Sequence, residues 1–171
     1  MKQSGRTLKQ RLYNLGQLPG RVARARYFRG HGVHSPYVYS IVRQVFMRRD
    51  LMASRHDLYD ELLALGAPMR RAIQLQNLMI HCGYAPYAIN ALPEGCPYAI
   101  LSSKMGESET LALVEEAKRL QATLVLSRPY DCRERTKLCN RIVEQHRCTS
   151  IDNRGYLILF NNHLPKQHFK L

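Results

Sequence analysis

Residues 97–126, which read PYAILSSKMGESETLALVEEAKRLQATLVL, decide the fold. Tyr98–Leu101 and Thr123–Leu126 are short apolar runs, the pattern of strands that are buried on both faces. Ser103–Gln121 lies between them, and its apolar residues recur at helical spacing while Glu115, Glu116, Lys118 and Arg119 fall on the other side. The apolar positions of this helix are Leu111, Leu113, Val114, Ala117 and Leu120. Strand, helix and strand in this order predict a parallel pair joined by a helical crossover.

The chain after this unit continues the alternation. Asp131–His146 is predicted as a helix that turns Leu138, Ile142 and Val143 inward. Thr149–Asp152 and Tyr156–Phe160 flank the turn Asn153-Arg154-Gly155, which is a hairpin signal. The predicted class is therefore α/β, a truncated Rossmann-like sheet with a parallel pair and a C-terminal antiparallel hairpin.

Helices are predicted before the sheet. The strongest start signal is Ser35 as N-cap followed by Pro36 at the first helical position, and it opens a helix over residues 36–49. The apolar stripe of this helix is Val38, Ile41, Val42, Val45 and Phe46. Further helices are expected over 55–65 and 69–81, and two shorter ones within the first 29 residues. We divide the chain into a basic N-terminal helical arm with its first strong helix, 1–50, and a reduced α/β domain, 51–171.

Composition limits the class of protein. At 45% hydrophobic and 23% charged residues, the 171-residue chain is typical of one soluble globular domain. Its longest apolar runs are about six residues, whereas a membrane helix needs roughly twenty. The five cysteines form an odd set without a Cys-x-x-Cys pair, and no apolar signal-peptide segment precedes them, so we expect free thiols and a cytoplasmic location. An organelle transit peptide is the alternative for the Arg-rich start.

Charge is distributed unevenly along the chain. Lys and Arg number 26 against 13 Asp and Glu, a net charge of +13, yet residues 1–49 hold eleven basic residues and no acidic one. Clustered cations suit nucleic acid or another polyanion, while a solvated arm, anionic lipid or an acidic protein partner are the alternatives. The candidate contact residues are Arg21, Arg24, Arg26, Arg29, His31 and His34, with Tyr27 and Phe28 interleaved as in surfaces that stack on bases.

Two terminal motifs carry a family resemblance. The first is Gly30-His31-Gly32-Val33-His34-Ser35-Pro36-Tyr37-Val38, and the second is the tail Lys166-Gln167-His168-Phe169 after the hairpin. Together they resemble a bacterial subgroup of the class I S-adenosylmethionine-dependent methyltransferases, over about half of the chain. The resemblance implies a Gly-rich cofactor loop after the first strand and an acidic residue at the end of the second.

The chain departs from that family where the cofactor would bind. Residues 82–97 occupy the place of three strands and their helices, and Ser127-Arg128 replace the acidic residues that the family carries after the strand at Thr123–Leu126. We therefore expect a degenerate methyltransferase-like protein that is non-catalytic and serves as a binding or scaffolding domain. No catalytic, cofactor-binding or metal residue is assigned, and S-adenosylmethionine is a ligand only if the family activity survives. A basic RNA-binding module and an active methyltransferase are the alternatives.

Chain geometry gives a last expectation. If residues 87–92 formed a strand parallel to Tyr98–Leu101, the five residues between them would have to replace a crossover of about a dozen. We therefore predict that 87–92 is not a parallel strand, and that the sheet has four strands at 98–102, 123–127, 149–153 and 156–161. Cys132, Cys139 and His146 recur every seven residues, about 10 Å apart along a helix, which is too far for a shared metal ion.

Overall fold

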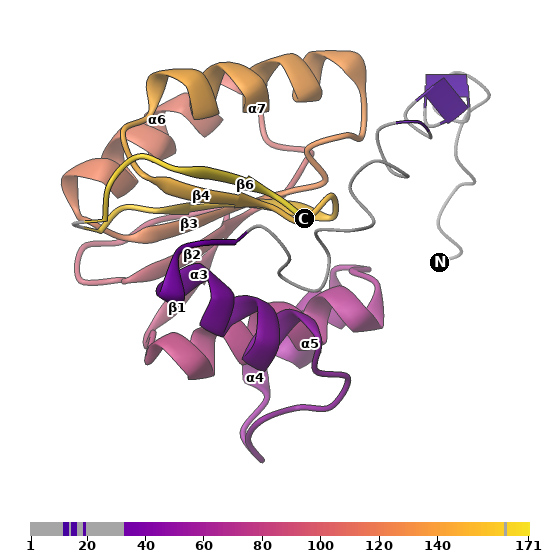
Figure 1. Cartoon of the computed structure of the whole chain (residues 1–171), viewed down its shortest axis with the longest axis vertical. Helices are drawn as coiled ribbons and strands as arrows, with labels where there is room; N and C mark the ends of the chain where they lie inside the picture. Colours follow the sequence, from indigo (N-terminus) through magenta and orange to yellow (C-terminus); the bar gives the residue numbers. More distant parts are fainter. Residues whose placement is uncertain (1–11, 14, 17–18, 20–32, 163) are drawn as a thin grey trace. The chain divides into compact units, whose positions relative to one another are not determined.

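The computed structural model describes residues 12–13, 15–16, 19, 33–162 and 164–171 (Figure 1). From residue 33 on, the chain divides into two compact units, a helical unit that ends at Ala85 and an α/β unit that begins at Pro86. Of the two N-terminal helices expected, residues 12, 13, 15, 16 and 19 are described and are helical, and the remainder lies outside the described residues. Among the described helices, none combines the length and the apolar character that crossing a membrane requires.

The helical unit begins at the predicted start signal. α3 spans Pro36–Ile41, and the Ser35 side chain accepts a hydrogen bond from the Val38 N–H, which confirms the N-cap. The helix continues as a π-helical turn, η2, at Val42–Phe46, where the Met47 N–H donates to the Val42 carbonyl at 3.1 Å. The predicted apolar stripe is buried at every position: Val38, Ile41, Val42, Val45 and Phe46. Two further helices complete the unit, α4 at Asp57–Ala64 and α5 at Met69–Cys82.

Three buried amide side chains on α5 hold the segment that connects η2 to α4. Gln74 donates to the Phe46 carbonyl at 2.9 Å, and Gln76 accepts from the Tyr59 N–H at 3.0 Å. Asn77 accepts from the Met52 N–H at 2.9 Å and donates to the Asp50 carbonyl at 2.8 Å. Because a buried amide without partners is destabilising, these bonds fix the connecting segment against α5.

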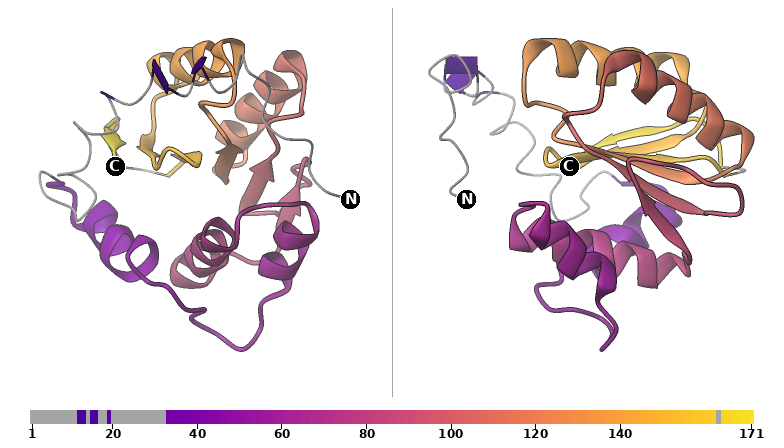
Figure 2. Two further views of the ribbon diagram at one scale, coloured as in Figure 1. Left: turned by 90° about the vertical axis from the view of Figure 1, so that its right-hand side faces the viewer. Right: turned by 180° about the vertical axis from the view of Figure 1, so that it is seen from behind.

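The α/β unit is built on a six-stranded mixed sheet in the order β1-β2-β3-β5-β4-β6. The strands are β1 Tyr87–Ile89, β2 Tyr98–Leu101, β3 Thr123–Ser127, β4 Thr149–Asp152, β5 Tyr156–Phe160 and β6 His168–Lys170. β1, β2 and β3 are parallel, and the predicted hairpin β4–β5 inserts β5 antiparallel between β3 and β4. The helices α6 (Glu107–Arg119) and α7 (Arg133–Gln145) cover one face of this sheet, as Figures 1 and 2 show. The α/β class, the parallel strands and the hairpin are therefore confirmed.

The prediction that residues 87–92 contain no parallel strand is wrong. Tyr87–Ile89 pairs in parallel with Tyr98–Ile100 at the edge of the sheet, and β6 adds a strand beside β4, so the sheet has six strands rather than four. The strand is shorter than we assumed, which leaves residues 90–97 for the return. Asn90 and Gly95 adopt positive φ angles of 56° and 76°, and these tight reversals allow a crossover without a helix.

Both faces of the sheet are buried, as the continuous apolar runs indicated. Alternate residues such as Leu124 and Leu126 contribute to a core with the inner faces of α6 and α7. Their neighbours on the opposite face, among them Val125 and Ile158, are fully buried as well. The return segment contributes Leu92 and Cys96 to the first of these cores, which explains how so short a crossover is held.

Candidate functional site

The carboxyl ends of five strands lie at one edge of the sheet. β1, β2 and β3 are mutually parallel, and β4 points the same way because each of β3 and β4 is antiparallel to β5. β6 is parallel to β4 and ends at the same edge. Open α/β sheets bind ligands outside the carboxyl ends of their strands, where the loops leading to the helices converge. We call this the carboxyl edge, and its loops are 90–97, 102–106, 127–132 and 153–155.

Unusual backbone conformations gather at the carboxyl edge. Of the four non-glycine residues with positive φ among those described, Asn90, Arg128 and Arg154 lie in these loops, at φ angles of 56°, 48° and 52°. Each conformation is held by hydrogen bonds between neighbouring loops and strands: the Asn90 side chain accepts from the Ser102 N–H at 2.7 Å, and the Arg128 N–H donates to the Gly155 carbonyl at 2.8 Å. Such conformations persist only where the surroundings fix them, and they cluster at functional sites.

A buried cation lies beneath this edge. Arg135, in the first turn of α7, is only 6% exposed. Its guanidinium donates to Thr110 Oγ1 at 3.4 Å and to the carbonyls of Ser102 and Ser127 at 3.5 Å, which are the residue after β2 and the last residue of β3. These three bonds are at the long limit for N–H···O, and the Nε–H has no acceptor.

No carboxylate in the described part of the chain pairs with Arg135. The acidic side chains of the neighbouring loops and first helical turns are engaged elsewhere. Asp131 accepts from the Ser103 hydroxyl at 3.3 Å, Glu107 pairs with Arg141 at 2.5 Å, and Glu109 accepts from the Gly106 N–H at 3.2 Å. The site therefore places an uncompensated positive charge under the strand ends.

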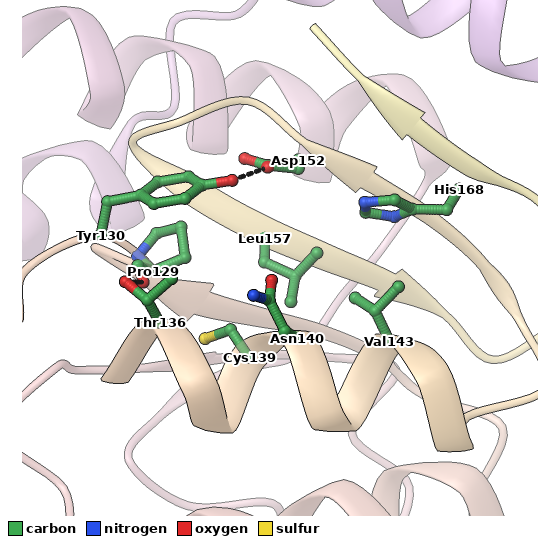
Figure 3. A pocket seen from close by; sticks show the side chains of 9 residues that line it. All are labelled: Pro129, Tyr130, Thr136, Cys139, Asn140, Val143, Asp152, Leu157 and His168. Carbon is green, nitrogen blue, oxygen red and sulfur yellow. Dashed lines mark hydrogen bonds between the residues drawn. The ribbon is translucent and has the colours of Figure 1, made fainter. Parts of the chain in front are cut away.

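A hollow opens beside the same edge, between α7 and the strands β4–β6 (Figure 3). It is shallow, with a cavity volume of about 10 Å³, which is room for about one water molecule. The Tyr130 hydroxyl donates to the Asp152 carboxylate at its mouth, and Asp152 also accepts from the Arg154 N–H at 2.9 Å. The lining residues are Pro129, Tyr130, Thr136, Cys139, Asn140, Val143, Asp152, Leu157 and His168.

The chemistry of this hollow is that of hydrogen bonding rather than nucleophilic attack. Burial raises the pKa of the Cys139 thiol to about 11, even though the nearby Arg135 charge lowers it, so the thiol is protonated at neutral pH. The His168 Nδ1 is within 2.8 Å of the Ser150 hydroxyl, and that hydroxyl also donates to the Gln167 carbonyl at 3.5 Å. Tyr130, Asp152 and His168 thus make internal hydrogen bonds that fix their positions.

Of the candidate contact residues named from the sequence, only His34 is described by the structure, and it is exposed in the segment before α3. Arg21, Arg24, Arg26, Arg29 and His31 fall outside the described residues. All five cysteines are free thiols, and the described residues contain no group of His, Cys, Asp and Glu that could hold a metal ion.

The sequence contained a signal for Arg135 that we did not use. Arg135, Leu138, Cys139 and Ile142 follow one another at i, i+3, i+4 and i+7, and all four are buried on one face of α7. Helical spacing therefore placed a cation on the inward face. The predicted inward face of this helix, Leu138, Ile142 and Val143, did not include Arg135.

Comparisons with protein-family models, with curated proteins and with solved structures find no match.

Proposed function

We propose that this protein is a non-catalytic binding or scaffolding domain derived from the class I methyltransferase architecture, acting in the cytoplasm. The observation that carries the proposal is the position of β1 at the edge of the sheet, followed directly by the short return 90–97. In the family that the terminal motifs resemble, a Gly-rich loop at this place leads into a helix whose N-terminus approaches the cofactor. Here the return is bent at Asn90 and packs Leu92 and Cys96 into the core.

The end of β3 supports the same proposal. Where the resemblance implies acidic residues, Ser127 ends the strand and Arg128 follows it, with Arg135 below. Ser127 and Arg128 do not provide, at this strand end, the carboxylates that would hold ribose hydroxyls, a metal ion or an amine substrate. Retention of the scaffold with altered chemistry at the strand ends is what we expect of a binding domain.

The experiment is a calorimetric titration of the full chain with S-adenosylmethionine and S-adenosylhomocysteine. We expect no binding at ligand concentrations up to about 1 mM, which corresponds to a binding free energy weaker than about −4 kcal/mol. A micromolar dissociation constant for either compound would refute the proposal and favour an active methyltransferase.

A second candidate function is nucleic-acid binding by the basic N-terminal arm. It is favoured by the eleven Lys and Arg residues without an acidic one in 1–49. Four of them are candidate contacts, together with His31 and His34: Arg21, Arg24, Arg26 and Arg29. Binding of RNA to the full chain would weaken steeply as salt is raised from 50 to 200 mM, because each phosphate contact releases counterions. A chain that lacks residues 1–29 would lose this affinity, and affinity that survives the deletion would exclude the arm as the binding element.

A further inference from the structure

We propose that Arg135 binds the carboxylate group of a small-molecule ligand at the carboxyl edge of the sheet. The inference rests on the proposed function, because it names the class of ligand for a domain that binds without catalysis. It concerns a residue of α7 that neither the terminal motifs nor the basic arm includes.

The first argument is the state of the guanidinium. An arginine that compensates its charge within a protein forms bonds of about 2.7–2.9 Å, commonly two in parallel, with a carboxylate. Arg135 is 6% exposed, forms no bond shorter than 3.4 Å, and leaves its Nε–H without an acceptor. Burying a charged group with such weak compensation is unfavourable. Folding has already removed water from the guanidinium, so an anionic partner that binds here does not add that desolvation cost to its binding free energy.

The second argument is the position of this side chain. Its guanidinium reaches the carbonyls that end β2 and β3, and it contacts Thr110 in the first helical turns of α6. It therefore lies between two loops, 102–106 and 127–132, at the edge where open α/β sheets bind ligands. Both loops lead into helices of 13 residues, whose first N–H groups add donors and a partial positive charge.

The neighbouring charges select a carboxylate rather than a phosphate. Asp131 lies in one loop, and the first turns of the two helices carry Glu107, Glu109 and Glu134. These acids oppose a doubly charged ion more strongly than a singly charged one. The planar fork of Arg135 matches the two oxygens of a carboxylate, and its buried Nε–H lacks an acceptor among the described residues.

The alternative is a purely structural arginine that ties the strand ends together through the Ser102 and Ser127 carbonyls. The two roles differ in one measurable respect, because a structural tie does not respond to anions. The Nε–H of Arg135 is the atom to observe, since it has no acceptor within the protein.

The test is an NMR titration of the full chain that follows the arginine Nε–H resonances. Sodium acetate is the carboxylate probe, sodium phosphate is the second probe, and sodium chloride holds the ionic strength constant. We expect acetate to shift the Arg135 Nε–H resonance saturably, with a dissociation constant on the order of millimolar, as suits a ligand of four non-hydrogen atoms. Phosphate should bind more weakly.

Variants on the same turn of α7 give the control. Arg135→Gln should abolish the acetate-induced shifts of the backbone N–H groups in loops 102–106 and 127–132, whereas Arg133→Gln, an exposed arginine two residues earlier, should retain them. Arg135→Lys keeps the charge and loses the fork, so it should weaken acetate binding at least tenfold.

Three results would overturn the proposal. One is a shift that chloride reproduces, another is a shift unchanged in Arg135→Gln, and the third is tighter binding of phosphate than of acetate. If Arg135→Gln does not fold, the wild-type titration and the Arg135→Lys variant still test whether Arg135 binds acetate. S-adenosylmethionine binding is measured separately, so failure of the proposed function and failure of the carboxylate site give different results.

Discussion

The two units of this protein differ in one buried polar side chain. Most buried polar side chains of the α/β unit are hydrogen-bonded, as Asn161 is to the Ala122 carbonyl at 2.8 Å and Thr149 is to the Pro165 carbonyl at 2.8 Å, and Arg135 is the exception. In the helical unit the buried polar side chains are the neutral amides Gln74, Gln76 and Asn77, and each meets a backbone partner between 2.8 and 3.4 Å. In the α/β unit the guanidinium of Arg135 is buried with bonds of 3.4–3.5 Å alone and without an acidic partner among the described residues.

The difference separates polar groups that stabilise the fold from those that are available for function. Satisfied amides hold a connecting segment in place, and removing them leaves backbone groups unpaired. A poorly compensated buried charge does little for stability, so its position at the carboxyl edge requires another explanation. Four measurements test this contrast, taken from the largest expected effect to the smallest.

The largest effect comes from raising the pH, because the buried thiols of the α/β unit ionise much less readily than the same thiols in the unfolded chain. Burial raises the pKa of Cys139 to about 11 and that of Cys148 to about 12. An unfolded thiol ionises near pH 8.5–9, so the unfolded state gains free energy from ionisation above that pH while the folded state keeps its protons. Stability from these thiols is therefore complete below about pH 8.5 and is lost as the pH rises through 9 toward 11–12.

By pH 10 we expect the two thiols to lower the free energy of unfolding by about 2–3 kcal/mol in total. Urea titrations between pH 7 and pH 10 measure this, and the double variant Cys139→Ala/Cys148→Ala isolates it from the lysines and tyrosines that titrate in the same range. An identical pH dependence in wild type and double variant would show that the two thiols are not shielded as described.

Asn77→Ala tests whether a fully hydrogen-bonded buried amide stabilises the helical unit. The change removes the partners of the Met52 N–H and the Asp50 carbonyl, and should cost about 1–3 kcal/mol. Hydrogen exchange of the segment 47–56 and urea unfolding monitored on the helical unit are the measurements. Asn140→Ala is the matched control, because Asn140 is exposed and makes no hydrogen bond to a described residue, and it should stay within about 0.5 kcal/mol of wild type. Equal effects of the two variants would contradict the structural role of Asn77.

Ser35→Ala tests the N-cap of α3 in the helical unit. The serine caps α3, but its bond from the Val38 N–H is 3.4 Å long, so we expect a loss of about 0.5–1 kcal/mol, at the lower end for N-caps. Ser35→Asp should restore this stability, since aspartate caps equally well. A loss above about 2 kcal/mol would mean that Ser35 does more than cap the helix.

Arg135→Met is expected to change stability least, although the residue is as buried as the amides. Methionine fills a similar volume without a charge, so the free energy of unfolding should remain within about 0.5 kcal/mol of wild type. A loss of 2 kcal/mol or more would place Arg135 with the structural amides and remove the contrast between the two units.

Much of the fold could be predicted because its signals are local. The Ser35-Pro36 cap, the apolar stripe of the following helix and the turn Asn153-Arg154-Gly155 each depend on a few adjacent residues, and the structure confirms all three. Helix boundaries were less accurate: α6 begins at Glu107 and not at Ser103, because Gly106 is its N-cap and residues 103–105 form a turn.

The edge strands were missed because the evidence for them is not local. Tyr87–Ile89 and His168–Lys170 are three residues each, too short for a recognisable alternation, and each becomes a strand only by pairing with β2 or β4. The crossover rule that argued against β1 assumed a longer strand and a helical connection, whereas Asn90 and Gly95 reverse the chain within the eight residues 90–97.

The sequence by itself determined the α/β class, the order of the main strands and helices, and the concentration of positive charge in residues 1–49, because hydrophobic periodicity, capping and composition are properties of neighbouring residues. Only the tertiary structure decided which charges are compensated. Arg135 has four acidic residues within reach along the chain or on the adjoining helix, and whether any of them meets its guanidinium depends on how β2, β3, α6 and α7 converge. Charge compensation acts over a few ångströms in space and so depends on side chains brought together by folding, which is why the carboxyl edge became a candidate site only in three dimensions.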